Sequence, residues 1–252
     1  MELFCGFAFR NSKALKEVVL SELGVDVPIK VIPNGVDLHH FRMANQPIER
    51  SSLGYSKEDV VLIYMGRIAP EKNLPFLLQS FSGLAQAYDY ARLLVIGDGP
   101  ELESIQNMAY EIGIADKTKF TGMVPYTDIV NYLAIGDVFV TASITEVHPL
   151  SVIEAMSSGL PVLGIASPGI EDTVKNGETG LLSENDMAGF TARMVKLVTE
   201  KDLRAEMGCK ARLTAENYAI EKTASLILNE YQRLTSHAFH NVKRVKSNYI
   251  SF

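Results

Sequence analysis

The segment VVLIYMGRIAPEKNLPFLLQSFSGLAQAYDYARLLVIG, residues 60–97, decides the fold. It begins with an uninterrupted apolar run, passes through a loop that holds Gly66 and Pro70, and then repeats apolar residues at the spacing of an amphipathic helix. A second apolar run, residues 93–97, closes the segment. A strand, a helix and a strand in this order predict a βαβ unit, in which the two strands run parallel.

The same alternation of apolar strands and amphipathic helices continues to residue 182. We expect strands at residues 60–65, 93–97, 119–122, 138–142, 161–165 and 180–182. Between them, the spacing predicts helices at residues 74–87, 101–112, 127–135, 150–158 and 169–175. Nearly continuous Val, Ile and Leu in most of these strands indicates burial on both faces. The sequence therefore predicts an α/β fold with a doubly wound, Rossmann-like parallel sheet, which binds ligands outside the carboxyl ends of its strands.

Segments on both sides of this repeat predict further elements. Residues 11–24 show a helical apolar spacing, and VPIKVIPNGVD, residues 27–37, predicts a short strand and a turn. Residues 39–59 are polar and without periodicity, which indicates a connector. After the last strand we expect extra C-terminal helices at residues 186–199, 201–217 and 220–237. The apolar stripe of the final helix indicates packing rather than a binding groove.

Composition restricts the class of function. A net charge of -6 argues against a general nucleic-acid binder, because phosphate contacts need a basic surface. Cys5 and Cys209 lie far apart and form no metal or redox spacing, so we expect a reducing, cytoplasmic setting. No apolar run is long enough to span a membrane. The basic cluster at residues 243–246 indicates a solvated tail, with a weak, peripheral contact to an anionic membrane as the alternative.

Two carboxylates mark the stretch ITEVHPLSVIEAMSSGLP, residues 144–161. Pro149 suits the first position of a helix and Gly159 the residue just past its end, which places Glu146 in the preceding loop and Glu154 inside the helix. Because helical side chains lean toward the N-terminus, Glu154 points back toward Glu146. Unpaired N–H groups and the positive end of the dipole suit a phosphate at the same place. The stretch therefore predicts an anionic ligand flanked by two hydroxyl-binding carboxylates.

Two further loops follow the carboxyl ends of predicted strands. In GRIAPEKN, residues 66–73, the cations Arg67 and Lys72 are placed to neutralise a diphosphate, with a pair of solvated surface cations as the alternative. GDGP, residues 97–100, begins a dinucleotide fingerprint but does not complete it, because Leu102 stands where the last glycine belongs. We interpret GDGP as a tight turn that lets another segment approach.

These motifs together resemble a known family. GRIAPEKN, then GDGP, then FTGMV, then the two glutamates separated by seven residues, are similar to the nucleotide-binding C-terminal half of the retaining glycosyltransferases with the GT-B fold, the large family 4, glycosyl transferases group 1. VIPNGVD resembles the passage between the two domains of that family. The resemblance covers about residues 10–235.

The resemblance implies a function and a set of site residues. It implies a hexosyltransferase-like enzyme that transfers a sugar from a nucleotide-diphosphate sugar of the UDP or GDP type, with retention and without an obligatory metal or other cofactor. Glu146 is the candidate catalytic residue and contacts the hydroxyls of the donor sugar. The residues that it assigns to donor binding are Gly66, Arg67, Lys72, Val124, His148, Leu150, Ser151 and Glu154.

Six of these residues have an implied role. Arg67 and Lys72 bind the diphosphate, and Glu154 binds the ribose. Backbone groups at Leu150 and Ser151 approach the phosphate, and those around Val124 approach the base.

The sequence departs from the family pattern at two places. Val147 and His148 stand where the family often has a glycine and an aromatic residue, so His148 either senses the donor phosphate or fills an aromatic slot. Pro168 takes one position of a common double glycine, which leaves Glu171 as an open candidate for a further hydroxyl contact.

The family also has an α/β domain upstream that holds the acceptor. We therefore expect residues 1–56 to be a remnant of that domain with the interdomain connector, residues 57–218 to bind the nucleotide sugar, and residues 219–252 to form a C-terminal helix and tail. The expected partners are the donor and an acceptor that is a glycan, a lipid or a small molecule, and the chain alone should transfer poorly. The alternatives are a non-catalytic nucleotide-sugar-binding module or partner subunit, and a sugar-nucleotide epimerase on the same fold.

Overall fold

A six-stranded parallel sheet forms the centre of the computed structural model, which describes residues 8–10, 16–17, 20–21 and 29–248. Its strands are β3 (Val60–Met65), β4 (Ala91–Ile96), β5 (Thr118–Phe120), β6 (Val138–Thr141), β7 (Val162–Ile165) and β8 (Gly180–Ser183). Every neighbouring pair is parallel, and the order across the sheet is β5-β4-β3-β6-β7-β8. The predicted doubly wound α/β fold is confirmed.

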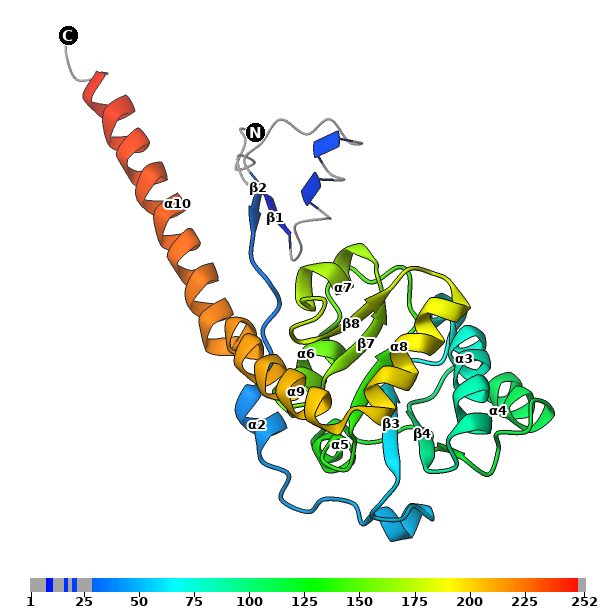
Figure 1. Cartoon of the computed structure of the whole chain (residues 1–252). Coiled ribbons are helices and arrows are strands. Elements are labelled where there is room, and N and C mark those ends of the chain that lie inside the picture. Colours follow the sequence, from blue (N-terminus) through cyan, green and yellow to red (C-terminus); the bar gives the residue numbers. More distant parts are fainter. Residues whose placement is uncertain (1–7, 11–15, 18–19, 22–28, 249–252) are drawn as a thin grey trace.

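Helices cover both faces of this sheet (Figure 1). Along β3, Val60, Leu62 and Tyr64 join one hydrophobic cluster, whereas the residues between them join the other, so the strand is buried on both sides. The first cluster includes residues of α3 (Leu74–Ala87), α4 (Leu102–Glu111) and α8 (Met187–Thr199). The second includes residues of α5 (Tyr126–Leu133), α6 (Leu150–Ser157), α7 (Pro168–Thr173) and α9 (Lys201–Ala215).

The strand order reverses between β3 and β6. The chain proceeds from β3 to β4 and β5 on one side, and then returns to place β6 on the other side of β3. A crevice opens at such a reversal, because the two connections leave the sheet in opposite directions. The loops that follow β3 and β6 carry the predicted cations and Glu146, so the topology brings the two sets of residues to one place.

The segment before the sheet is more structured than the sequence indicated. Strand β2 (Ile29–Val31) pairs in parallel with β1 (Ala8–Arg10). The predicted connector contains α2 (Leu38–Arg42) and a 3-10 helix, η1 (Arg50–Leu53). The Asp37 carboxylate caps α2 by accepting a hydrogen bond from the His40 N–H at 3.0 Å. Of the helix expected at residues 11–24, the described residues 16–17 and 20–21 are helical and the others lie outside the described residues.

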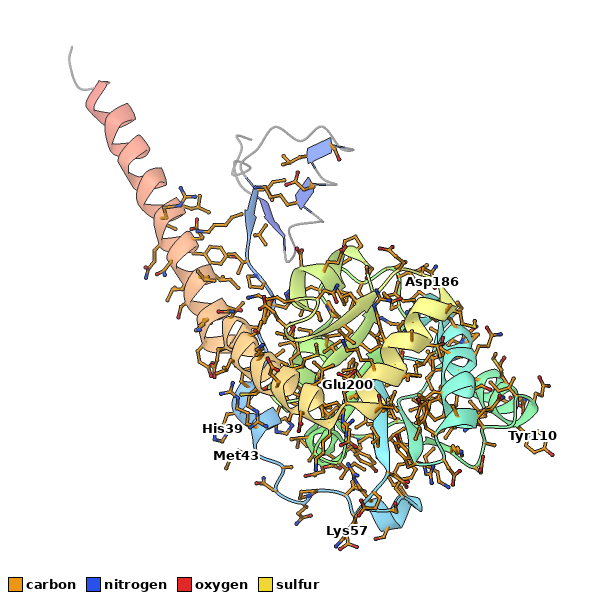
Figure 2. All side chains as sticks on the ribbon, viewed as in Figure 1. His39, Met43, Lys57, Tyr110, Asp186 and Glu200 are labelled. Carbon is orange, nitrogen blue, oxygen red and sulfur yellow. The ribbon has the colours of Figure 1, made fainter. Side chains whose placement is uncertain are left out.

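The C-terminal part is helical, as expected. Figure 2 labels Asp186 and Glu200, which cap the two ends of α8. After α9 and the 3-10 helix η3 (Glu216–Tyr218), α10 (Ile220–Asn248) runs past the predicted end and extends away from the sheet (Figure 1). The prediction that its apolar stripe is packed is wrong, since Leu228 and Tyr231 are more than half exposed. Among the described residues, no helix combines the length and the apolar character that crossing a bilayer requires.

Candidate functional site

The loops after β3 and β6 are tied to each other by hydrogen bonds. The Ser143 hydroxyl donates to the Glu71 carbonyl oxygen at 3.1 Å, and the Asn73 side chain donates to the Ala142 carbonyl oxygen at 3.3 Å. Asn73 itself has a left-handed backbone (φ 54°), which ends the 3-10 turn η2 (Pro70–Lys72) and starts α3. These contacts hold the cationic loop against the loop that carries Glu146.

A polar cavity of about 250 Å³ lies between these two loops. The cavity contains charged side chains of both signs and the N-terminal turn of α6. Its lining residues are Tyr64, Met65, Gly66, Arg67, Glu71, Lys72, Thr141, Glu146 and Ser151. Five residues predicted from the sequence therefore lie together: Gly66, Arg67, Lys72, Glu146 and Ser151.

Both cations of this cavity already have a carboxylate partner. The Lys72 ammonium lies 2.6 Å from Glu146 Oε1, and the two side chains are only 23% and 16% exposed. Arg67 pairs with Glu71 four residues along the chain, and the Arg67 side chain is 66% exposed. The two pairs sum to zero charge. The charges of the cavity are therefore neutralised internally, through one half-buried and one exposed ion pair.

An apolar cavity of about 490 Å³ adjoins the polar one. The two cavities share Met65, Gly66 and Arg67. The remaining lining residues of the apolar cavity are Ile96, Gly97, Asp98, Gly99, Met123, Val124 and Ile129. Apolar side chains on two sides of a cavity suit a flat ring system, and the predicted residue Val124 is among them.

The GDGP turn lines the apolar cavity and is hydrogen-bonded to the loop that the two cavities share. The Gly66 N–H donates to the Ile96 carbonyl at 3.0 Å, and the Ile68 N–H donates to the Asp98 carbonyl at 2.8 Å. A Cβ atom on Gly97 would lie 2.0 Å from the Gly66 carbonyl oxygen, so only glycine permits this approach. The prediction that GDGP admits another segment is confirmed.

Helix α6 presents its N-terminus to the polar cavity. Pro149 is the N-cap and not the first helical residue, one position earlier than predicted, and its carbonyl accepts from the Val152 N–H at 3.2 Å. The N–H groups of Leu150 and Ser151, the first two residues of the helix, have no partner inside it. Ser151 lines the cavity, and Leu150 is 41% exposed. An anion in the polar cavity would therefore face free N–H groups and the positive end of the helix dipole.

Glu154 lies farther inside α6 and is buried, at 7% exposed. Burial raises its pKa from 4.5 to about 7, and a hydrogen bond from the Tyr126 hydroxyl lowers it in part. Tyr126 in turn stacks on the His40 ring, with centroids 5.7 Å apart, and packs edge-on against Phe41. Among the described ion pairs, none includes Glu154. This carboxylate is thus held by burial and a phenol, and it lies outside the lining of the two cavities.

His148 packs against Tyr218 instead of lining either of these cavities. The ring centroids are 5.6 Å apart, and both ring nitrogens are buried without a hydrogen-bond partner. Burial lowers the pKa of His148, so the ring is neutral at pH 7. This packing favours the aromatic-slot interpretation, and a contact between His148 and the donor stays a prediction.

The segment with the departing Pro168 supports the Glu146 loop. Pro168 begins α7, and the next N–H, that of Gly169, donates to the Glu146 carbonyl at 2.9 Å. A Cβ atom on Gly169 would lie 2.4 Å from the same oxygen. Glu171 is exposed and lies outside both cavity linings, so its suggested hydroxyl contact stays a prediction.

Four residues that line the polar cavity were not predicted from the sequence: Tyr64, Met65, Glu71 and Thr141. Glu71 stands inside GRIAPEKN, where the motif does not reveal that it pairs with Arg67. Tyr64 and Met65 are the last two residues of β3, and Thr141 ends β6. The Tyr64 hydroxyl donates to the Arg67 carbonyl at 2.8 Å. The rule that ligands bind at strand ends would have found these three strand residues. In the described part of the chain, no group of three or more His, Cys, Asp or Glu side chains is placed to hold a metal ion.

Comparison with protein families identifies a match over most of the chain. The model for glycosyl transferases group 1 matches residues 45–214. The chain is 30% identical over 209 residues to alpha-monoglucosyldiacylglycerol synthase of Streptococcus pneumoniae, covering 79% of this chain and 47% of that protein. It is 31% identical over 223 residues to 2-deoxystreptamine glucosyltransferase of Streptomyces kanamyceticus, covering 86% of this chain and 58% of that protein. The chain thus spans about half the length of the curated relatives it matches.

Solved structures share the fold. Sucrose-phosphate synthase from Thermosynechococcus elongatus superposes with a TM-score of 0.82 at 21% identity, covering 92% of this chain and 59% of that one. HepE of Anabaena, solved in complex with UDP, gives a TM-score of 0.82 at 20% identity, covering 91% of this chain and 64% of that one. At this level of identity, the similarity establishes the architecture alone.

Proposed function

The chain belongs to the glycosyl transferases group 1 family, and we propose that it is the donor-binding part of a retaining glycosyltransferase that uses a nucleotide-diphosphate sugar. The observation that carries this proposal is the pair of adjoining cavities at the β3/β6 reversal, one apolar and one with two cations. A nucleotide sugar has the matching chemistry, since a flat base is joined through a charged diphosphate to a hydroxyl-rich ring.

The apolar cavity takes the base and the polar cavity takes the diphosphate. Val124 and Ile129 contact the faces of the base, and backbone groups beside Val124 bind its edge. Arg67 and Lys72 neutralise the diphosphate together with the free N–H groups of the first turn of α6. Protein cations at a leaving diphosphate supply the charge stabilisation that a metal ion provides elsewhere, so the reaction needs no metal and no further cofactor.

The two glutamates bind different hydroxyl groups. Glu154 lies inside α6 and binds the ribose hydroxyls after Tyr126 moves aside or shares the carboxylate. Glu146 lies on the polar cavity and contacts the hydroxyls of the transferred sugar. The site therefore holds the donor at four points: the base, the ribose, the diphosphate and the transferred sugar.

Transfer requires an acceptor that is held outside the cavities described above. We propose a glycan, a lipid or a small molecule as the class of acceptor. The names of two relatives, alpha-monoglucosyldiacylglycerol synthase and 2-deoxystreptamine glucosyltransferase, support the lipid and the small molecule. We propose that the whole protein holds the acceptor in a domain to which residues 1–56 belong, that residues 57–218 bind the donor, and that residues 219–252 form the C-terminal helix and tail.

A thermal-shift screen tests the proposal. UDP, GDP and ADP, each alone and as a sugar derivative, are added to the chain at increasing concentration. A ligand at 100 times its dissociation constant stabilises the folded state by about 2.7 kcal/mol, so a cognate nucleotide raises the melting temperature by several degrees. The proposal fails if none of the three series raises the melting temperature, or if the shift persists in the Arg67→Ala/Lys72→Ala variant.

A further inference from the structure

The half-buried ion pair between Lys72 and Glu146 lies in the polar cavity, where the proposed function places the diphosphate. Lys72 Nζ and Glu146 Oε1 lie 2.6 Å apart, inside the polar cavity. The two residues are 74 positions apart in sequence, and each is held by its own loop. The contact is thus a property of the folded site and not of one flexible segment.

Local hydrogen bonds fix both partners. The backbone around Lys72 is anchored through Glu71 and Asn73 to the loop after β6. The Glu146 carbonyl accepts from the Gly169 N–H at 2.9 Å. Since both backbones are restrained, the carboxylate returns to the ammonium whenever no other anion is present.

A diphosphate and the Glu146 carboxylate compete for this one ammonium. Both competitors are anions. The side chains of Lys72 and Glu146 are only 23% and 16% exposed, so solvent screens the repulsion between the diphosphate and the carboxylate weakly. Binding a phosphate on Lys72 therefore displaces Glu146 from the ion pair. A displaced carboxylate in a half-buried site needs new hydrogen-bond donors, because leaving it without partners is costly.

We propose that Glu146 is a specificity determinant that discriminates a nucleotide sugar from the bare nucleoside diphosphate, by acting as the exchangeable counter-ion of Lys72. This inference rests on the proposed function. The hydroxyl groups of a donor sugar offer Glu146 the hydrogen-bond donors that it loses on leaving Lys72. A bare nucleoside diphosphate offers none, so it binds at a disadvantage.

The same exchange assists the release of product. After transfer, the sugar hydroxyls leave the polar cavity with the acceptor, and the nucleoside diphosphate remains on Lys72. Glu146 then has no hydroxyl partner and competes for the ammonium again, which weakens the binding of the product.

Calorimetry on the wild type and Glu146→Gln tests the inference, with UDP against UDP-glucose and GDP against GDP-mannose as probes. Gln keeps the shape and removes the charge. We expect Glu146→Gln to bind the bare nucleoside diphosphate about fivefold more tightly, since one half-buried ion pair no longer has to be broken. We expect it to bind the nucleotide sugar more weakly, since the sugar hydroxyls lose a charged acceptor. Unchanged or weaker binding of the bare nucleoside diphosphate would overturn the inference.

Three controls separate the ion pair from other causes. Glu206→Gln removes a carboxylate from an exposed pair with Lys210 (2.5 Å) and should leave both affinities unchanged. In a Lys72→Ala background, Glu146→Gln should no longer tighten binding. Glu146→Asp keeps the charge, but its shorter side chain loses the close contact with Lys72. We expect it also to bind the bare nucleoside diphosphate more tightly. It replaces Glu146→Gln if that variant does not fold.

The outcome separates this inference from the proposed function. If the wild type binds no probe, both are overturned. If the wild type binds a nucleotide and Glu146→Gln does not bind it more tightly, only the counter-ion role is overturned.

Discussion

The two ends of the ITEVHPLSVIE stretch hold the same chemical group in opposite environments. In the loop, Glu146 lies 2.6 Å from the Lys72 ammonium on the wall of a polar cavity. On the second turn of α6, Glu154 is 7% exposed and has a tyrosine as its partner. The loop carboxylate is held by an opposite charge, and the helix carboxylate is held in spite of its charge.

This difference teaches how one ligand can be bound by two kinds of interaction. On the loop side, charges are already compensated, so a ligand binds by exchanging one anion for another. On the helix side, burial penalises the ionised carboxylate, and a ligand that donates two hydroxyl groups relieves that penalty. Changes of charge should therefore act on the loop side, and changes of pH on the helix side.

Removing both cations of the loop side should have the largest effect. Each charge-assisted contact to a phosphate contributes about 1.5–3 kcal/mol, so Arg67→Ala/Lys72→Ala should weaken the binding of a nucleoside diphosphate about 1,000-fold. Calorimetry measures this loss. The matched control Lys175→Ala/Lys210→Ala removes two exposed cations elsewhere and should bind normally. Unchanged affinity in the first variant would show that the loop does not bind the diphosphate.

Removing the charge of Glu154 should stabilise the protein at alkaline pH. The folded state holds its proton up to about pH 7, whereas the unfolded state loses it near pH 4.5, so wild-type stability falls between these two values as pH rises. At about 1.4 kcal/mol per pKa unit, the accumulated loss at pH 8 is about 3 kcal/mol. Urea unfolding should find Glu154→Gln more stable than the wild type by this amount at pH 8, and by about 1 kcal/mol or less at pH 5. A difference that does not depend on pH would refute the buried-carboxylate account.

A methyl group on Gly169 should disturb the loop side alone. The new Cβ would lie 2.4 Å from the Glu146 carbonyl oxygen, so the loop has to move, at a cost of about 2 kcal/mol in the free energy of unfolding. We expect Gly169→Ala to weaken the binding of a nucleotide sugar about tenfold, since the substitution displaces Glu146. Gly177→Ala strains a left-handed backbone (φ 80°) shortly after α7 without a contact at the new Cβ, so it controls for general loss of stability. If Gly169→Ala weakened the binding of a bare nucleoside diphosphate as much as that of the nucleotide sugar, its effect would not be restricted to the loop side.

Removing the Tyr126 hydroxyl should produce the smallest effect. That hydroxyl hydrogen-bonds to Glu154 and lowers the pKa of the carboxyl group. Tyr126→Phe should therefore raise the pKa of Glu154 and shift the pH profile of nucleotide binding to higher pH. At pH 7 we expect an affinity about threefold lower, because fewer molecules have an ionised Glu154. The dissociation constant of one nucleotide is measured for both proteins between pH 6 and 9. The ionisation of the ligand affects both profiles equally, so it does not contribute to their difference. Superimposable profiles would exclude Tyr126 as a partner of Glu154.

The sheet and the position of the site followed from local patterns. Continuous apolar runs such as residues 60–65 belong to strands buried on both faces, and the loops after them lie at one edge in any parallel sheet. Helix α2 was missed because its five residues are too few to show a period, although Asp37 caps it and Leu38 and Phe41 are buried. The stripe of α10 was misinterpreted, since periodicity shows that a helix is amphipathic but not what covers its apolar face.

The electrostatics of the site were beyond sequence reasoning. The Lys72–Glu146 pair requires β6 to lie beside β3, and the strand order does not follow from the apolar runs. From the motif alone, removing Glu146 should not affect a bare nucleotide, whereas the ion pair predicts tighter binding. The raised pKa of Glu154 depends on burial beneath Tyr126 and beside α2, which are distant in sequence.

The ratio of two affinities tests the division between the carboxylates most directly. Calorimetry gives the dissociation constants of UDP and UDP-glucose, or of GDP and GDP-mannose, for the wild type, Glu154→Ala and Glu146→Ala. We expect Glu154→Ala to weaken the binding of both ligands of a pair equally, because both contain the ribose. The ratio of the two dissociation constants should then equal that of the wild type. Glu146→Ala should lower the preference for the nucleotide sugar at least tenfold. If both variants change the ratio equally, or neither changes it, the two carboxylates do not bind different parts of one donor.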